Sequence, residues 1–267
     1  YSYAASGSGR GVDLNNDVIA ASGTVSMTGQ HNTGATYALS LSGSTSVTAG
    51  TGVTLESLNN NTGTIALLSS GGINGGSGTV LMRAANYAFG GADRTITTTG
   101  VLTIEPDADE NSFASSFDNQ YLNPVSVTGL TLGKSSNASA ITLSRAISLS
   151  GPVSIYGGSI DVNANITANS GNILLDADTG STLNQSSTGI LLDDVITIET
   201  VTSGNLTLIG RSGDTGSGFD GIDASSANTT TLRSAGNLTL QGYSYAASGS
   251  GRGVDLNNDV IAASGTV

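Results

Sequence analysis

Acidic side chains offer the first candidate for chemistry in this sequence. The stretch EPDADENSF places Asp107, Asp109 and Asn111 at alternate positions, as at the start of a calcium-binding loop. Such a loop also needs a glycine and a distal bidentate glutamate, and neither follows at the right spacing. A second stretch, TGSGFDGI at residues 215–222, is close to the nonapeptide calcium-roll repeat, which binds ions in tandem copies. We therefore expect solvated acidic loops at both places, with no metal site and no cofactor.

Catalysis by a carbohydrate-active enzyme is the second chemistry to weigh. A lyase acting on acidic sugars needs clustered basic residues and usually a bound cation. The basic residues here are instead scattered along the chain: Arg10, Arg83, Arg94, Lys134, Arg145, Arg211, Arg233 and Arg252. His31, the only histidine, lies in the polar stretch QHNTG, and the adjacent Asp193 and Asp194 would face opposite sides of a strand. We expect no catalytic residues, and a polysaccharide lyase or hydrolase is the alternative function.

The composition predicts an ordered, β-rich chain. Its 267 residues include 38 Gly and only 10% charged residues, with no Cys and no Trp. Charged helix formers are too few for long solvated helices, whereas Val, Ile and Leu recur too regularly for a disordered chain. The net charge of -12, with Lys134 as the only lysine, argues against nucleic acid as a partner. The sequence also lacks an apolar stretch of about 18 residues, so we expect no membrane insertion.

A long repeat defines the predicted domain organisation. The stretch YSYAASGSGRGVDLNNDVIAASGTV occupies residues 1–25 and returns without a change at residues 243–267. The period is 242 residues, and diverged repeats within one domain do not keep every exposed Ser and Asn. We therefore interpret residues 1–242 as one repeat unit and residues 243–267 as the start of the next identical unit. The first expected partner is the neighbouring identical repeat in the same chain.

A shorter repeat lies within the long one. A glycine followed by a strand with alternating apolar residues occurs nine times, in steps of 20 to 33 residues, at Gly23, Gly52, Gly78, Gly100, Gly129, Gly151, Gly171, Gly204 and Gly236. Segments of this length that cannot bury an apolar face alone are typical of solenoids. We predict an all-β fold, a parallel β-helix of roughly nine coils per 242-residue unit. In GNLTLIG, Leu206 and Leu208 should point inward and stack on Leu238 and Leu240 of the next coil.

One region resembles a known family. Residues 104–177 contain an acidic insertion followed by GLTLGK and then by GPVSIYGG. This order is similar to the repeat regions of filamentous-haemagglutinin-like giant surface adhesins of Gram-negative bacteria. The resemblance implies that the β-helix is right-handed. It also implies a location at the cell surface or outside the cell.

The expected function is that of a rod. Repeated modules would extend a structural or adhesive filament, and coils about 4.8 Å apart would add on the order of 43 Å per nine-coil unit. A third interpretation is a glycan-binding face of an adhesin, where exposed Tyr1, Tyr3 and Tyr37 would contact a sugar. Surface glycans and other rods are therefore further possible partners.

The alignment of the last two coils predicts a register. With an offset of 32 residues, Asp220 falls beside Arg252 and Asp223 beside Asp255. Ile222 lies between the acidic positions and should point inward, so we expect the charged groups to face outward. Asp220 should then pair with Arg252, while Asp223 and Asp255 should repel unless a cation or water lies between them.

Residues 105–124 are predicted to interrupt the regular coil. Pro106 and Pro124 each lack the N–H that a strand donates. Acidic residues cluster between them, so we expect an outward loop with Phe113 and Phe117 folding back over apolar surface.

Overall fold

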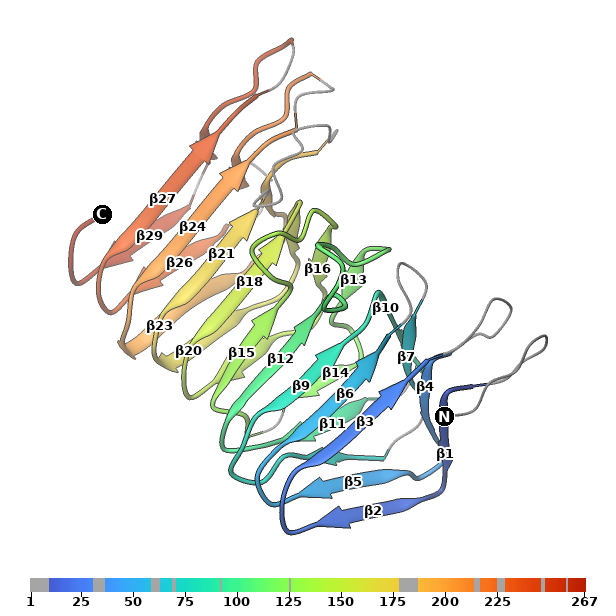
Figure 1. Ribbon diagram of the computed structural model, residues 1–267. Coiled ribbons are helices and arrows are strands. Elements are labelled where there is room, and N and C mark those ends of the chain that lie inside the picture. The colour runs from blue at the N-terminus through green and yellow to red at the C-terminus, as the bar shows by residue number, and fades with distance from the viewer. Residues whose placement is uncertain are drawn as a thin grey trace. The chain divides into compact units, whose positions relative to one another are not determined.

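All regular structure in the described residues is β-strand, as Figure 1 shows for the computed structural model. The structure describes residues 10–30, 37–58, 63–68, 71–91, 93–124, 126–177, 187–213, 217–224, 229–245, 248–257 and 259–267. Among these residues there is no helix, and so none that could cross a membrane. The chain divides into two compact units: unit 1 comprises residues 1–117 and 121–133, and unit 2 comprises residues 118–120 and 134–267.

Unit 1 contains three parallel sheets, one for each face of a coil. Successive coils add one strand to each sheet, so the residues that pair lie 22 to 28 positions apart in sequence. The first sheet holds β1 (Val12–Asn15), β4 (Leu39–Ser42), β7 (Thr64–Leu67) and β10 (Asn86–Phe89). The second holds β2 (Val18–Ala21), β5 (Ser46–Ala49), β8 (Ile73–Asn74), β11 (Arg94–Thr97) and β14 (Leu122–Pro124). The third holds β3 (Val25–Gly29), β6 (Val53–Ser57), β9 (Val80–Arg83), β12 (Val101–Glu105) and β15 (Gly129–Leu132).

Unit 2 repeats this arrangement. Its first sheet holds β16 (Ile141–Leu143), β19 (Ile160–Val162), β22 (Ile190–Leu192), β25 (Ile222–Ala224) and β28 (Val254–Leu256). The second holds β17 (Ile147–Leu149), β20 (Ile166–Ser170), β23 (Thr197–Ser203), β26 (Thr231–Ser234) and β29 (Val260–Ala263). The third holds β18 (Val153–Gly157), β21 (Ile173–Ala177), β24 (Leu206–Arg211) and β27 (Leu238–Tyr243), and the short β13 (Phe117–Asp118) falls at the unit boundary. Parallel strands that pair from coil to coil make each unit a parallel β-helix, as predicted.

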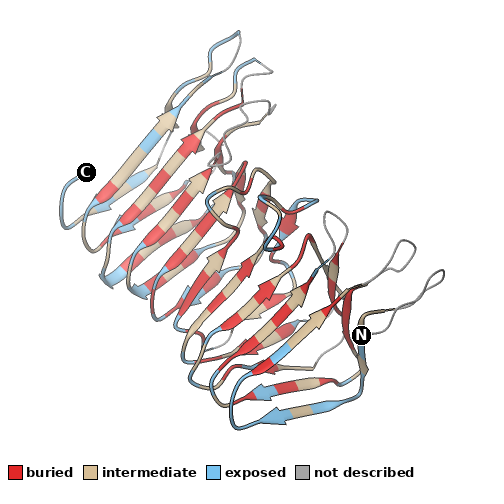
Figure 2. Ribbon diagram, viewed as in Figure 1, coloured by how far each residue is buried: buried red, intermediate tan, exposed pale blue. Residues whose placement is uncertain are grey.

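Alternation along the strands builds the core, and Figure 2 shows it as buried and less buried residues taking turns along strands such as β24. In β24, Leu206 and Leu208 are fully buried, and the register places them beside Leu238 and Leu240 of β27. The predicted apolar ladder is confirmed. The nine glycine-led strands are β3, β6, β9, β12 and β15 in unit 1 and β18, β21, β24 and β27 in unit 2, so the predicted number of coils is confirmed as well.

Glycine and asparagine form the corner before the third sheet of unit 2. Gly204 has φ +114, and a Cβ atom there would lie 2.0 Å from the carbonyl oxygen of Gly171. The next residue, Asn205, accepts a hydrogen bond from the N–H of Asn237 at 2.9 Å, and Asn237 accepts one from the N–H of Thr266 at 2.9 Å. Side-chain oxygens therefore continue the ladder of hydrogen bonds where the strand pairing stops. The two asparagines therefore act as corner residues that link successive coils.

The predicted interruption is confirmed in its first part. β12 ends at Glu105 and residues 106–116 form no strand, while Phe113 and Phe117 pack 5.5 Å apart and are each only 4% exposed. Two expectations were wrong. Pro124 ends a strand that pairs with β11, because proline needs only its carbonyl on the bonded edge. Asp107 is buried, with 1% of its surface exposed, so the acidic loop is not solvated throughout.

Candidate functional site at the repeated segment

The two copies of the repeated segment, residues 1–25 and 243–267, have the same strand positions where both are described. β1 and β28 both begin at the same valine of the repeat, Val12 and Val254, and β2 and β29 span the same four residues. The same turn follows, because the N–H of Asn15 bonds to Asp17 at 2.7 Å and that of Asn257 to Asp259 at 2.9 Å. The segment therefore keeps its local structure at two places in the chain.

The two copies differ in their neighbours. The first copy pairs with the following coil, where Val12 lies beside Leu39 and Val18 beside Ser46. The second copy pairs with the preceding coil, where Val254 lies beside Ile222. The first copy thus shows how a coil of this sequence bonds to the coil after it, and the second copy shows how such a coil bonds to the coil before it.

The first copy binds the following coil through one set of main-chain atoms. The N–H groups of Val12 and Val25 donate to Ala38 and Gly52, both at 3.0 Å. The carbonyl oxygens of Asp17, Ala21 and Gly23 accept hydrogen bonds from N–H groups of the following coil.

The second copy binds the preceding coil through a different set. The carbonyl oxygens of Arg252, Gly253 and Thr266 accept from Gly221, Ile222 and Leu238. The N–H groups of Val260, Ser264 and Gly265 donate to Thr230, Ser234 and Gly236.

No main-chain atom of the segment appears in both of these sets. Reduced by the 242-residue period, the second set belongs to Arg10, Gly11, Val18, Ser22, Gly23 and Thr24. Gly23 occurs in both lists, but with its carbonyl oxygen in the first copy and its N–H in the second. One coil of this sequence can therefore bond to both neighbours at once, since the two edges do not compete for a donor or an acceptor.

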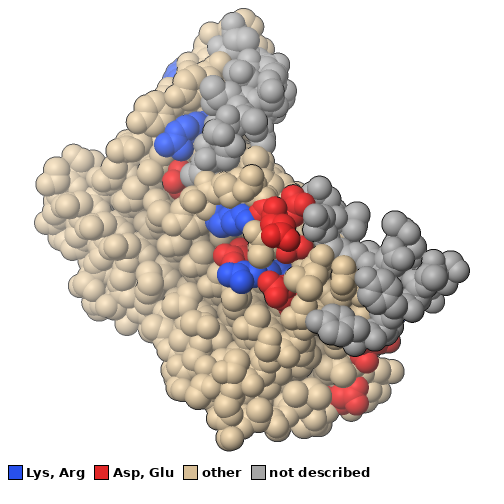
Figure 3. Space-filling model, viewed as in Figure 1, with Lys and Arg blue, Asp and Glu red and all other residues tan. Residues whose placement is uncertain are grey.

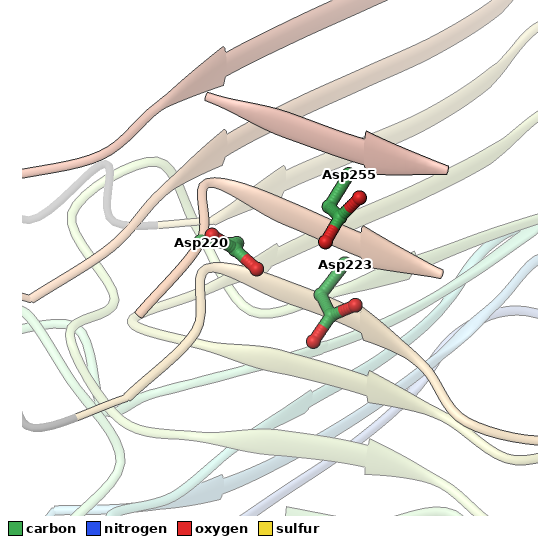
Figure 4. Close-up of side chains that lie close together, drawn as sticks. All are labelled: Asp220, Asp223 and Asp255. Carbon is green, nitrogen blue, oxygen red and sulfur yellow. The ribbon is translucent and has the colours of Figure 1, made fainter. Parts of the chain in front are cut away.

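Three carboxylates gather where the second copy meets the preceding coil. Asp220 lies just before β25, Asp223 lies in β25 and Asp255 in β28, and Figure 4 shows their side chains close together. One carboxylate oxygen of each lies within 4.8 Å of the others. Asp223 lies beside Asp255, which is the register that the sequence predicted.

The predicted ion pair between Asp220 and Arg252 is wrong. The guanidinium of Arg252 binds Asp255 three residues ahead in its own segment, and Asp220 accepts a hydrogen bond from the main-chain N–H of Arg252 instead. The first copy makes the same local pair, with Arg10 bound to Asp13 at 2.6 Å. The side chain of this arginine thus finds its partner within its own coil.

Asp220 does not face outward as expected, because only 8% of its surface is exposed. Burial raises its pKa, the hydrogen bond from Arg252 lowers it, and the charges of Asp223 and Asp255 raise it again. Carboxylate oxygens are the ligands that Ca²⁺ prefers, but all three of these groups already interact with other protein groups. A cation between Asp223 and Asp255 stays a prediction.

The second copy also places two tyrosines at the surface. Tyr243 and Tyr245 are each 43% exposed and stack with ring centroids 6.4 Å apart, and the guanidinium of Arg211 lies 5.6 Å from the ring centre of Tyr243. They are the repeats of Tyr1 and Tyr3, which lie outside the described residues. Tyr37, in unit 1, lies beneath Arg10 at 5.5 Å.

Two arginines on the third sheets are held by carboxylates of neighbouring strands. Arg83 lies between Glu56 at 3.9 Å and Glu105 at 2.5 Å, and Arg211 binds Asp176 at 3.2 Å. On the face drawn in Figure 3, basic and acidic groups lie in small mixed clusters.

Arg94 is a finding that the sequence reasoning missed. Only 1% of its surface is exposed, its Nη1 donates to the carbonyl of Gly71 at 2.6 Å, and burial lowers its pKa to about 10. Its Nε and Nη2 are buried without a hydrogen-bond partner among the described residues. The signal was present, because Arg94 lies two residues before the inward Ile96 and so has the same inward orientation.

The residues considered for catalysis are not brought together. His31 lies outside the described residues. Asp193 and Asp194 are exposed and lie in the turn between β22 and β23, so the strand geometry assumed for them was wrong. A groove of about 380 Å³ crosses β23, β26 and β29, and its lining includes one carboxylate, Glu199, and one guanidinium, Arg233. The groove does not hold the convergent set that a lyase needs.

Comparisons with known proteins add no family. No protein-family model matches the chain, and no match was found among curated proteins or solved structures.

Proposed function

We propose that the chain is a segment of a structural or adhesive rod, in which 242-residue β-helix units follow one another in a long tandem-repeat protein. The observation that carries the proposal is the complementary bonding of the two copies of the repeated segment. A coil of this sequence fits between the coil that ends one unit and the coil that continues the next. A location at the cell surface or outside a Gram-negative bacterium belongs to the same proposal and rests on the sequence resemblance.

The repeat predicts how the rod continues. Beyond the second copy, residues identical to 26–58 should add a coil whose Leu39 equivalent lies beside Val254, as Leu39 lies beside Val12. The amide of Val254 would then donate to the new coil, as Val12 donates to Ala38.

Hydrogen exchange of a chain extended by residues 26–58 tests the proposal. In the chain of 267 residues, we expect the amide of Val12 to exchange slowly and that of Val254 to exchange fast. In the extended chain, the Val254 amide should become as slow as that of Val12. An appended segment with the same composition in scrambled order is the control. If the correct extension leaves Val254 as fast as the scrambled one does, the tandem rod is wrong.

A glycan-binding face is the second candidate, because the exposed tyrosines Tyr243 and Tyr245 stack on each other and Arg211 lies over the ring of Tyr243. Flat aromatic faces bind the C–H faces of sugars, and a neighbouring guanidinium donates to hydroxyl or carboxylate oxygens. Glycan-array binding that is lost on Tyr245→Ala, with the strand content unchanged, would support it.

A further inference from the structure

We propose that the repeated segment is exchangeable between copies of the chain. Residues 10–25 of one copy can take the place of residues 252–267 of another, which joins the two copies head to tail. The inference rests on the tandem pairing of the proposed function, but it concerns separate chains and not successive units of one chain.

The preceding coil recognises atoms that both copies of the segment possess. In the structure, Gly221, Ile222 and Leu238 donate their N–H groups to carbonyl oxygens of the second copy. The same oxygens in the first copy belong to Arg10, Gly11 and Thr24, and none of them takes part in its bonds to the following coil. The first copy of another chain therefore presents the edge that this coil binds.

Side chains of the first copy also have the arrangement that the exchange requires. Arg10 already holds Asp13, so its main-chain N–H and not its guanidinium would meet Asp220 of the other chain, as that of Arg252 does. Asp17 holds the N–H of Asn15 with Oδ2. Its Oδ1 corresponds to the Asp259 Oδ1 that accepts from the N–H of Thr230 at 2.9 Å.

The exchange conserves contacts between coils. Each hydrogen bond that the displaced segment loses is replaced by the same bond from an identical residue. The exchange therefore leaves the contact area between coils unchanged. Joining two chains costs translational and rotational freedom, while the released segment regains conformational freedom. Exchange should therefore increase with protein concentration and should need opening of one coil, for example during refolding of mixed chains.

Disulfide trapping between 267-residue chains tests the exchange, because the sequence contains no cysteine of its own. One chain carries Asp223→Cys and the other carries Asp13→Cys, the repeat of the Asp255 that lies beside Asp223. Neighbouring strands are about 4.8 Å apart, within the Cα separation that a disulfide spans. The two chains are unfolded, mixed, refolded at high concentration and oxidised with diamide.

We expect a disulfide-linked dimer of the two variants to form on the order of 100-fold faster than with a control partner, since docking raises the effective thiol concentration from roughly ten micromolar to about one millimolar. The control partner carries Thr48→Cys, an exposed strand residue of unit 1 that lies away from the edge to be exchanged. A second pair, Thr231→Cys with Val18→Cys, samples the other strand of the same edge, because Thr231 lies beside Val260. It provides the result if the first pair does not fold.

A single chain with both Asp223→Cys and Asp255→Cys separates the two proposals. If its internal disulfide forms and the mixed chains link no faster than the control, the exchange is wrong and the tandem pairing stands. If the internal disulfide does not form in folded protein, the pairing on which the proposed function rests is wrong as well.

Discussion

Asp255 lies directly beside Asp223 in the register of β28 and β25. Because Asp255 is the repeat of Asp13, this pair lies where the second copy of the repeated segment meets the preceding coil. The neighbouring Arg252 neutralises Asp255 from within its own segment, and Asp220 is left buried with a main-chain partner. The second copy of the repeated segment is therefore bound to the preceding coil mainly through backbone hydrogen bonds, while Arg252 and Asp255 form an ion pair within the copy.

The buried Asp220 should make stability depend on pH. Its pKa is raised, chiefly by burial, so the folded protein binds this proton more tightly than the unfolded chain and ionisation at neutral pH costs stability. That cost disappears as the pH falls below the unfolded value of roughly 3.9. Asp220→Asn keeps an acceptor for the N–H of Arg252 and should be more stable than the wild type at pH 7, with the difference closing near pH 4. Urea unfolding at both pH values measures it, and a variant that is equally destabilised at both would contradict the prediction.

The apolar ladder should dominate the stability of unit 2. Leu208 is fully buried beside Leu175 and Leu240, so Leu208→Ala should lower the free energy of unfolding by about 2–5 kcal/mol. Thr207→Ala, one residue earlier on the outward face, should change it by less than about 0.5 kcal/mol. Denaturant unfolding of both variants checks this, and equal effects would mean that the assignment of the two faces is wrong.

Arg94 should contribute packing and not charge. Two of its nitrogen atoms are buried without hydrogen-bond partners in the part of the chain that the structure describes, so Arg94→Met, which keeps the volume and removes the charge, should leave unit 1 as stable or more stable. Arg94→Ala leaves a cavity and should cost on the order of 2–5 kcal/mol. Thermal unfolding of the two variants compares them. A methionine variant as unstable as the alanine variant would show that the guanidinium itself is needed.

The asparagine corner should be worth about one hydrogen bond. Asn205→Ala removes the acceptor for the N–H of Asn237, and the expected cost is about 0.5–1.5 kcal/mol, with faster exchange of the Asn237 amide. Asn169→Ala is the control, because Asn169 is exposed and accepts a hydrogen bond from the Thr202 hydroxyl with its main-chain carbonyl. Exchange that is unchanged at Asn237 would rule out the side-chain ladder.

The parts of the structure that follow from periodicity could be predicted. Alternation placed Leu206 and Leu208 inward, and the spacing of glycines placed them beside Leu238 and Leu240. The partner of Arg252 could not be predicted in this way, because a long side chain can reach along its own strand as easily as across to the next. Asp220 precedes its strand, at a corner where alternation no longer fixes the direction of a side chain.

The interruption after Glu105 was predictable in place but not in extent. The prolines marked its two ends, yet Pro124 lies in β14, the outermost strand of its sheet, where proline is tolerated because one edge of the strand is unpaired among the described residues. The packing of Phe113 against Tyr87, with ring centroids 5.8 Å apart, follows from how the loop closes over unit 1. A distant pair of this kind leaves no periodic signal.

The length of a chain with two 242-residue repeats tests the tandem rod most directly. Residues 1–242 followed by the full 267 residues would contain one additional unit, and its nine coils at about 4.8 Å each should lengthen the particle by on the order of 43 Å at constant width. Electron microscopy of the chains with one and with two 242-residue repeats measures length and width. A straight particle longer by this amount is the predicted result, whereas two bodies joined at variable angles would contradict a β-helix that continues through the repeat.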